Sequence, residues 1–95
     1  MRKQDLARTV AQRTNQSEAQ ANAAVSAVFS VIQEALAAGD EVRISGFGAF
    51  RVIERSPRQG RHPRSGAPMR IGSRRSAAFR AGSQLKRSIS GAIDD

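Results

Sequence analysis

Residues 54–76 cannot bury themselves, and this constrains the fold more than any other feature of the sequence. Their only large apolar side chains are Met69 and Ile71, and arginine, glycine, proline and serine dominate the rest. The glycine, proline and serine content of 60–66 predicts a reversal of the chain. The segment is therefore either a disordered linker or a long two-stranded arm, and an isolated ribbon is marginal in water without a partner.

The residues before position 40 are predicted to form two helices. Apolar residues recur at helical spacing up to Thr14-Asn15, which offers a stop. The second helix begins with a capping box, in which the Ser17 hydroxyl and the Gln20 amide satisfy backbone donors. Gly39 supplies the left-handed position that ends it.

The second helix has a wide apolar face. At 100° per residue, its apolar side chains cover about half of the circumference. Packing against one helix and one small sheet would cover only part of so wide an apolar face. A second protomer would cover the rest, so a dimer is predicted. The side chains assigned to the dimer core are Val25, Phe29, Ile32, Phe47, Phe50 and Phe79.

Two short strands are predicted on either side of a glycine-rich turn. Residues 41–45 and 50–52 alternate with period two, and Gly46 and Gly48 allow a tight reversal between them. These glycines do not form a nucleotide-binding loop, because Arg51 stands where the third glycine of that fingerprint belongs and no helix follows.

The excess positive charge lies entirely in the second half of the chain. Residues 1–48 carry five bases and five acids, whereas residues 49–95 carry eleven bases and three acids, which is the whole net charge of +8. Eight arginines fall between positions 51 and 75. A polyanion, and nucleic acid first, is the expected partner. Guanidinium groups grip phosphate or a narrow minor groove, and 51–78 holds no aromatic residue on which single-stranded bases could stack, so a duplex is favoured.

The sequence offers few residues suited to catalysis. The one histidine, His62, lies among arginines at the expected loop tip, and no nearby carboxylate would orient it. No cluster of ligands suits a metal, cysteine is absent, and no cofactor is expected. No apolar run approaches the roughly 18–20 residues of a membrane span, and the start lacks the layout of a secretory signal. A soluble, cytosolic protein without enzymatic activity is predicted.

Three motifs carry a resemblance to a known family. They are Gly39-Asp40-Glu41-Val42 with Gly46-Phe47-Gly48-Ala49-Phe50, then Gly60-Arg61-His62-Pro63-Arg64-Ser65-Gly66, then Ala78-Phe79-Arg80-Ala81-Gly82 with Leu85-Lys86. Together they closely resemble the HU/IHF family of bacterial DNA-bending proteins, over residues 1 to about 90 and without a gap. The pairing of the second motif's tip with Gly-Phe-Gly-x-Phe is highly specific.

The resemblance implies an α+β fold in an intertwined dimer. Each chain would be one domain, in which 1–39 form the helical dimerisation part, 40–53 and 76–82 the sheet body, 54–75 a β-ribbon arm, and 83–93 a short helix begun by Gly82-Ser83 as turn and N-cap. The arms would lie in the minor groove of double-stranded DNA, with Pro63 as a wedge between base pairs. Composition alone, without the resemblance, favours a plain turn former at Pro63 over a wedge.

The resemblance also implies a set of DNA-binding residues. On the flanks of the body, Lys3, Arg80, Lys86 and the backbone near Gly46 would hold phosphates. With the tip and the arm arginines that the composition already favours, the whole expected set is Lys3, Gly46, Arg51, Arg55, Arg58, Arg61, His62, Arg64, Arg70, Arg74, Arg75, Arg80 and Lys86. Such a protein would compact DNA in the bacterial nucleoid with little sequence preference and would favour bent, nicked or flexible duplexes.

The sequence departs from the family pattern at several places. His62 replaces the usual asparagine, Gly72 and Ala77 stand where proline is common, Ser83 stands where lysine often does, and 91–95 form an unexplained acidic extension. Two alternatives stay open beside an HU-like homodimer: an IHF-like, site-preferring subunit of a heterodimer, and a basic protein associated with RNA or the ribosome.

Overall fold

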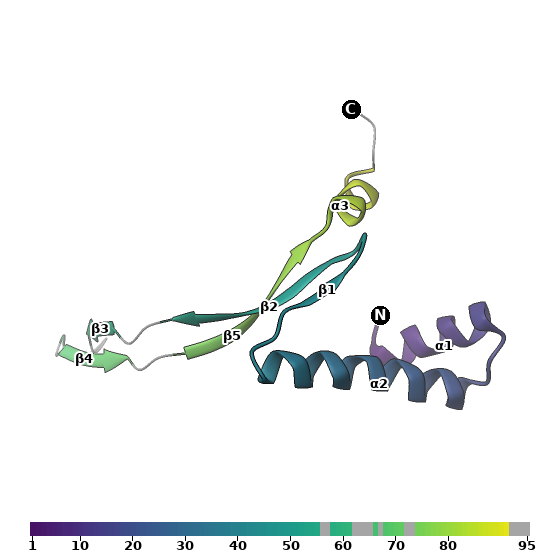
Figure 1. The fold of residues 1–95 in the computed structure, drawn as a ribbon, viewed down its shortest axis with the longest axis horizontal. Helices are drawn as coiled ribbons and strands as arrows, with labels where there is room; N and C mark the ends of the chain where they lie inside the picture. The colour runs from purple at the N-terminus through teal and green to yellow at the C-terminus, as the bar shows by residue number, and fades with distance from the viewer. Residues whose placement is uncertain (56–57, 62–65, 67, 72–73, 92–95) are drawn as a thin grey trace. The chain divides into compact units, whose positions relative to one another are not determined.

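The computed structural model in Figure 1 describes residues 1–55, 58–61, 66, 68–71 and 74–91, with backbone only at 55, 58–61 and 68–71. The elements follow the order α1 (Lys3–Thr14), α2 (Glu18–Ala37), β1 (Val42–Ile44), β2 (Gly48–Arg55), β3 (Arg58–Arg61), β4 (Pro68–Ile71), β5 (Arg74–Ala81) and α3 (Ser83–Ser90). The α+β class predicted from the sequence is confirmed. The chain divides into two compact units, Met1–Ala38 and Gly39–Asp95.

Local capping sets the ends of the two long helices, as the sequence predicts. Helix α1 ends at Thr14, where Asn15 adopts the left-handed conformation with φ of 57°. At the start of α2 the backbone N–H of Gln20 donates to the Ser17 hydroxyl at 3.1 Å, and the backbone N–H of Ser17 donates to the Gln20 side-chain oxygen at 3.2 Å. Gly39 follows α2 with φ of +89°, which an L side chain rarely adopts.

The helical unit buries few side chains on its own. Small residues let α1 and α2 approach closely: Ala7, Ala11 and Ala21 are 3%, 4% and 0% exposed, and no other described residue of the chain is buried. On the same unit the neighbouring side chains Val28 and Phe29 are 55% and 43% exposed. Large apolar side chains that lie open together favour a protein surface that covers them, which agrees with the predicted dimer.

A three-stranded antiparallel sheet forms the body of the second unit, in the order β1-β2-β5. Strand β2 pairs with β5 along its whole length and therefore continues well beyond the 50–52 predicted from alternation alone. Gly46, with φ of +80°, lies in the turn between β1 and β2, where the Phe47 N–H donates to the Ile44 carbonyl at 2.9 Å. Phe47 in turn accepts at 2.7 Å from the N–H of Gly82, which ties the turn to the start of α3.

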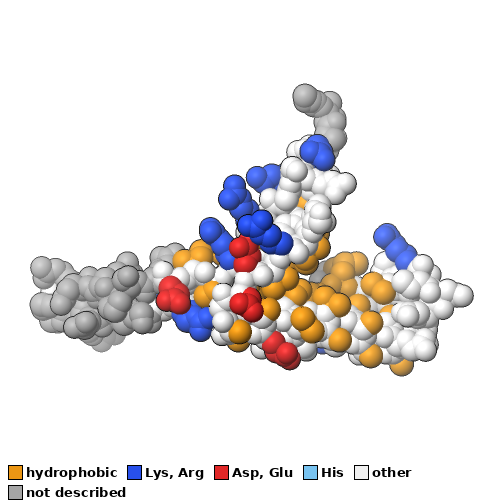
Figure 2. Space-filling model, in the orientation of Figure 1, with side chains coloured by type: hydrophobic (Ala, Val, Ile, Leu, Met, Phe, Trp, Pro, Cys, Tyr) orange, Lys and Arg blue, Asp and Glu red, His pale blue; other side chains and the backbone are white. Residues whose placement is uncertain are grey.

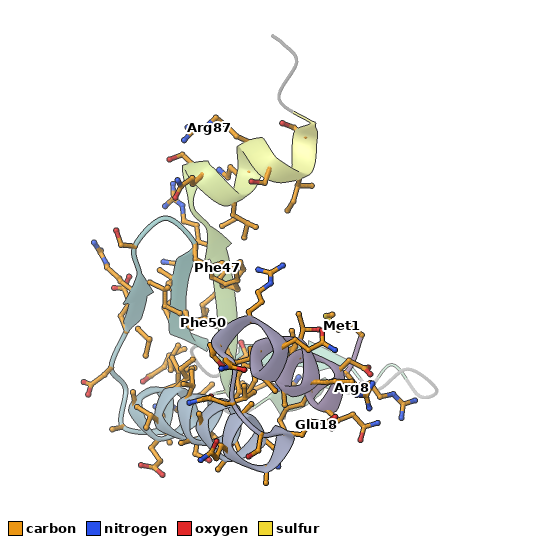
Figure 3. All side chains as sticks on the ribbon, turned by 90° about the vertical axis from the view of Figure 1, so that its right-hand side faces the viewer. Met1, Arg8, Glu18, Phe47, Phe50 and Arg87 are labelled. Atoms are coloured by element: carbon orange, nitrogen blue, oxygen red, sulfur yellow. The ribbon has the colours of Figure 1, made fainter. Side chains whose placement is uncertain are left out.

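Three phenylalanines form an aromatic cluster on this sheet. The Phe79 ring centroid lies 5.5 Å from that of Phe47 and 4.8 Å from that of Phe50, with tilted planes that suit aromatic pairs. Figure 3 labels Phe47 and Phe50 on this unit. Phe29, the fourth phenylalanine, belongs to the helical unit.

Gly48 is required by the packing of this cluster. A Cβ at Gly48 would lie 2.5 Å from both the Arg80 carbonyl oxygen and the Phe79 Cζ. Gly48→Ala should therefore lower the free energy of unfolding by about 1–3 kcal/mol, the usual cost of overpacking. Urea unfolding measures this, with Ser45→Ala in the exposed turn as the control. Equal stability of Gly48→Ala and the parent would contradict the close approach.

The structure shows that residues 58–61 and 68–71 are paired strands, and it places the N-cap of α3 at a residue other than the one predicted. Strands β3 and β4 pair antiparallel, from Arg58 opposite Ile71 to Arg61 opposite Pro68, so the paired residues form a ribbon rather than a linker. Ser83 was expected to cap the last helix, but the N-cap is Gly82 and no side chain caps it. The Gly82 N–H donates to the Phe47 carbonyl in the β1–β2 turn, which holds Gly82 in the extended conformation of an N-cap. The helix therefore begins one residue earlier than the preference for a serine N-cap predicts.

Candidate nucleic-acid interface

The register of the sheet sorts arginines onto one face. Side chains alternate between faces along a strand, and residues directly opposite each other share a face. Arg43, Ala49 and Arg80 form one row across the three strands. Arg51 is opposite Ala78 on the same face, whereas the aromatic cluster occupies the other face. Figure 2 shows lysine and arginine side chains gathered beside the strands of this unit.

A hollow of about 630 Å³ opens among these arginines. Arg43, Arg51 and Arg80 line it, and all three are exposed. Ala49 stands between them, and the glycines at 46, 48 and 82 line the same hollow with no side chain. The site is thus a shallow basic recess with small residues between long cationic ones, which suits a phosphate group better than a flat apolar ligand.

Three of the expected DNA-binding residues, Gly46, Arg51 and Arg80, come together at this hollow. The Gln84 side chain, in the first turn of α3, lies close to Gly46, because a Cβ built at Gly46 would clash with its amide oxygen. Lys86 lies on α3 of the same unit and is exposed. Lys3 is also exposed and is the first residue of α1, in the helical unit.

Arg74 and Arg75, both expected to bind DNA, lie on opposite faces of β5. Arg74 is opposite Arg55 and shares a face with the arginine row, whereas Arg75 is opposite Glu54 on the other face. The Arg75 Nε lies 3.9 Å from the Glu54 Oε2, so this arginine has a carboxylate partner. Because both side chains are half or more exposed, that ion pair stabilises the fold little.

Several expected site residues lie outside the described part of the chain. His62, Pro63 and Arg64 belong to the segment whose structure is not described, and only the backbone is described at Arg55, Arg58, Arg61 and Arg70. Their roles stay predictions.

Sequence reasoning missed Arg43, which lines the hollow. Arg43 could have been found from the period-two pattern of β1, which places it on the face opposite Val42 and Ile44. Arg87 is exposed in the last turn of α3, where it is labelled in Figure 3.

Two other features of the described residues bear on function: the placement of possible metal ligands and the apolar character of the helices. Among them, no three His, Cys, Asp or Glu side chains come close enough to hold a metal ion. None of the helices in the same residues combines the length and apolar character needed to cross a membrane.

Comparison with known proteins decides the family. The profile of the family described as bacterial DNA-binding protein matches residues 1–90. The chain belongs to the HU/IHF family of bacterial DNA-binding proteins. This confirms the resemblance inferred from the three motifs.

Individual relatives match this HU/IHF-family chain over nearly its full length. It is 45% identical to DNA-binding protein HU-1 of Halalkalibacterium halodurans, covering 94% of this chain and 99% of the relative. It is 46% identical to DNA-binding protein HU of Streptococcus thermophilus, covering 92% and 96%. Among solved structures, it is similar to Anabaena HU in a cocrystal with DNA, with a TM-score of 0.85, 35% identity, and coverage of 97% and 100%.

Proposed function

We propose that this protein is an HU-like architectural protein that binds, bends and compacts double-stranded DNA with little sequence specificity. The observation that carries the proposal is the arginine-bearing sheet face, where Arg43, Arg51 and Arg80 line an open hollow. The relatives named DNA-binding protein HU and the Anabaena HU–DNA cocrystal support the same ligand. No enzymatic role is proposed.

The arm is proposed to supply the bend. Arginines on the ribbon would track the phosphates and the negative potential of the minor groove, while Pro63 would enter between base pairs as an apolar wedge. Nicked or flexible DNA resists this distortion less, so such duplexes are the proposed preferred ligands. In the cell the protein would associate with the nucleoid.

The functional unit is proposed to be a homodimer. In the single chain Phe47 and Phe79 are 44% and 43% exposed although they belong to an aromatic cluster. Ile89 on α3 is 74% exposed. A second copy would cover such side chains and would double the number of arms and arginine faces that meet one duplex.

Salt dependence tests this function. If the dimer neutralises about eight to ten phosphates, log K should fall with log salt with a slope of roughly −7 to −9. Arg74→Gln, on the arginine face, should weaken binding to all duplex sequences and flatten the slope by about 0.9 for each phosphate that it no longer neutralises. Arg75→Gln is the matched control, because it removes the same charge at the next residue but on the opposite face.

The binding series is run on random, nicked and candidate-site duplexes and on structured RNA. Tighter binding to structured RNA than to nicked duplex would favour the RNA-associated alternative and overturn the proposal. Loss of binding at one duplex sequence alone in Arg74→Gln would indicate base readout and an IHF-like subunit instead.

A further inference from the structure

The hollow at Ala49 contains a carboxylate as well as arginines. Glu41, just before β1, is the one acidic side chain among the described residues that line it. Its Oε2 accepts a hydrogen bond from the Nε of Arg43 at 2.9 Å. Arginine forms the same charge-assisted contact with a phosphate oxygen as with a carboxylate. In this structure the hollow therefore already provides one anion for one of its cations.

The ion pair between Arg43 and Glu41 is exposed enough for another anion to replace the carboxylate. The Arg43 side chain is 80% exposed and Glu41 is 41% exposed, so the guanidinium extends into solvent while the carboxylate is partly held by the surface. Exposed ion pairs of this kind contribute little stability. A stronger or more highly charged anion that reaches the hollow can thus take Arg43 at small cost.

The spacing of Arg43, Arg51 and Arg80 suits the row of phosphate charges along a nucleic-acid backbone. Adjacent strands lie about 4.8 Å apart, so Arg43 and Arg80 are separated by roughly 10 Å across Ala49. Arg51 follows Ala49 by two residues along β2, or about 6.8 Å. Duplex DNA presents one charge per roughly 1.7 Å of its axis, which a triangle of this size can meet at more than one point.

We propose that this hollow is a phosphate site for the nucleic-acid backbone, and that Glu41 occupies Arg43 until a phosphate displaces it. The proposal rests on the proposed function, because the duplex supplies the phosphate. When the phosphate binds, the contact of Arg43 with Glu41 is exchanged for a contact of Arg43 with phosphate. The Glu41 carboxylate then stays beside the bound phosphate, where it repels it and cancels the charge that Arg43 contributes. Glu41 therefore lowers affinity and reduces the number of counterions released.

Glu41→Gln tests the inference through the salt slope. It should steepen the dependence of log K on log salt by about 0.9 for each hollow that holds a phosphate. Extrapolated from 1 M salt, that slope makes binding about eightfold tighter per hollow at 0.1 M. The matched control is Glu54→Gln, which changes net charge by the same amount on the opposite face of the same sheet, where Glu54 pairs with Arg75. Equal slopes for the two variants would overturn the role of Glu41.

A double-mutant cycle separates competition from plain repulsion. If Glu41 competes with phosphate for Arg43, Arg43→Gln should cost a larger factor in affinity in the Glu41→Gln background than in the parent, because Arg43 then gives up no other contact on binding. Equal factors in both backgrounds would mean that the two residues act independently and would overturn the exchange. Thermal unfolding of all four proteins checks that they are folded.

A titration followed by nuclear magnetic resonance identifies the source of the phosphate. The Arg43 Nε–H signal should move when a short duplex is added, and should move much less with inorganic pyrophosphate at equal ionic strength. An Arg43 signal that a bound duplex leaves in place would overturn the site, and an equal response to pyrophosphate would assign it to free phosphates. Failure of the parent chain to bind any duplex would overturn the proposed function itself, whereas duplex binding with equal slopes for Glu41→Gln and Glu54→Gln would overturn only this inference.

Discussion

Phe79→Ala should lower the free energy of unfolding by about 3–5 kcal/mol and leave most of the protein unfolded at ordinary concentrations. Phe79 is the central ring of the aromatic cluster, since both Phe47 and Phe50 pack against it. The few buried residues elsewhere in the described chain are alanines, so little other core compensates for the cavity. Because Phe79 is also 43% exposed in one chain, its loss should weaken the proposed dimer as well.

Urea unfolding at several protein concentrations measures both effects. The parent should become more stable as concentration rises, because only a folded dimer gains from mass action. Phe79→Leu is the matched control, which keeps most of the apolar volume and should lose much less stability. A Phe79→Ala protein as stable as the parent would contradict the central role of this ring, and a parent that sediments as a folded monomer at high concentration would refute the dimer.

The helix ends could be predicted from the sequence because local chemistry determines them. The Ser17–Gln20 capping box and the left-handed Asn15 satisfy backbone groups within a few residues of themselves, and the glycine after α2 adopts a positive φ. No knowledge of the tertiary fold is needed to place them. The predicted N-cap of α3 was wrong because a distant contact decides it. The Gly82 N–H donates to the carbonyl of Phe47, which is far away in sequence.

The arginine-lined site needed the strand register, which the sequence alone did not provide. Alternation placed 50–52 in a strand, but only the pairing of β2 with β5 shows how far β2 extends and that Arg51 shares a face with Arg80. The same pairing places Arg74 and Arg75 on opposite faces of β5, although both were predicted to bind DNA. Charge composition indicates a polyanionic partner, whereas long-range pairing decides which cations face it.

Pro63→Ala should lose most of the DNA bending while it keeps most of the salt-dependent affinity. The arginines attract the backbone through their charge, and this substitution removes no charge. The proposed wedge acts differently, by displacing stacked bases at a cost of a few kcal/mol per step. That cost is already partly met in nicked or flexible DNA, so the variant should also lose part of its preference for such duplexes.

Fluorescence energy transfer across a short end-labelled duplex measures the bend, beside a binding isotherm on the same DNA. The matched control is Pro68→Ala, which removes a proline from the same arm at the start of β4, opposite Arg61, and should leave the bend intact. If the Pro63→Ala protein bends DNA as sharply as the parent, Pro63 is a turn residue only. If both variants lose the bend and the affinity together, the prolines act by shaping the ribbon, because a wedge alone would leave the charged contacts of the arm in place.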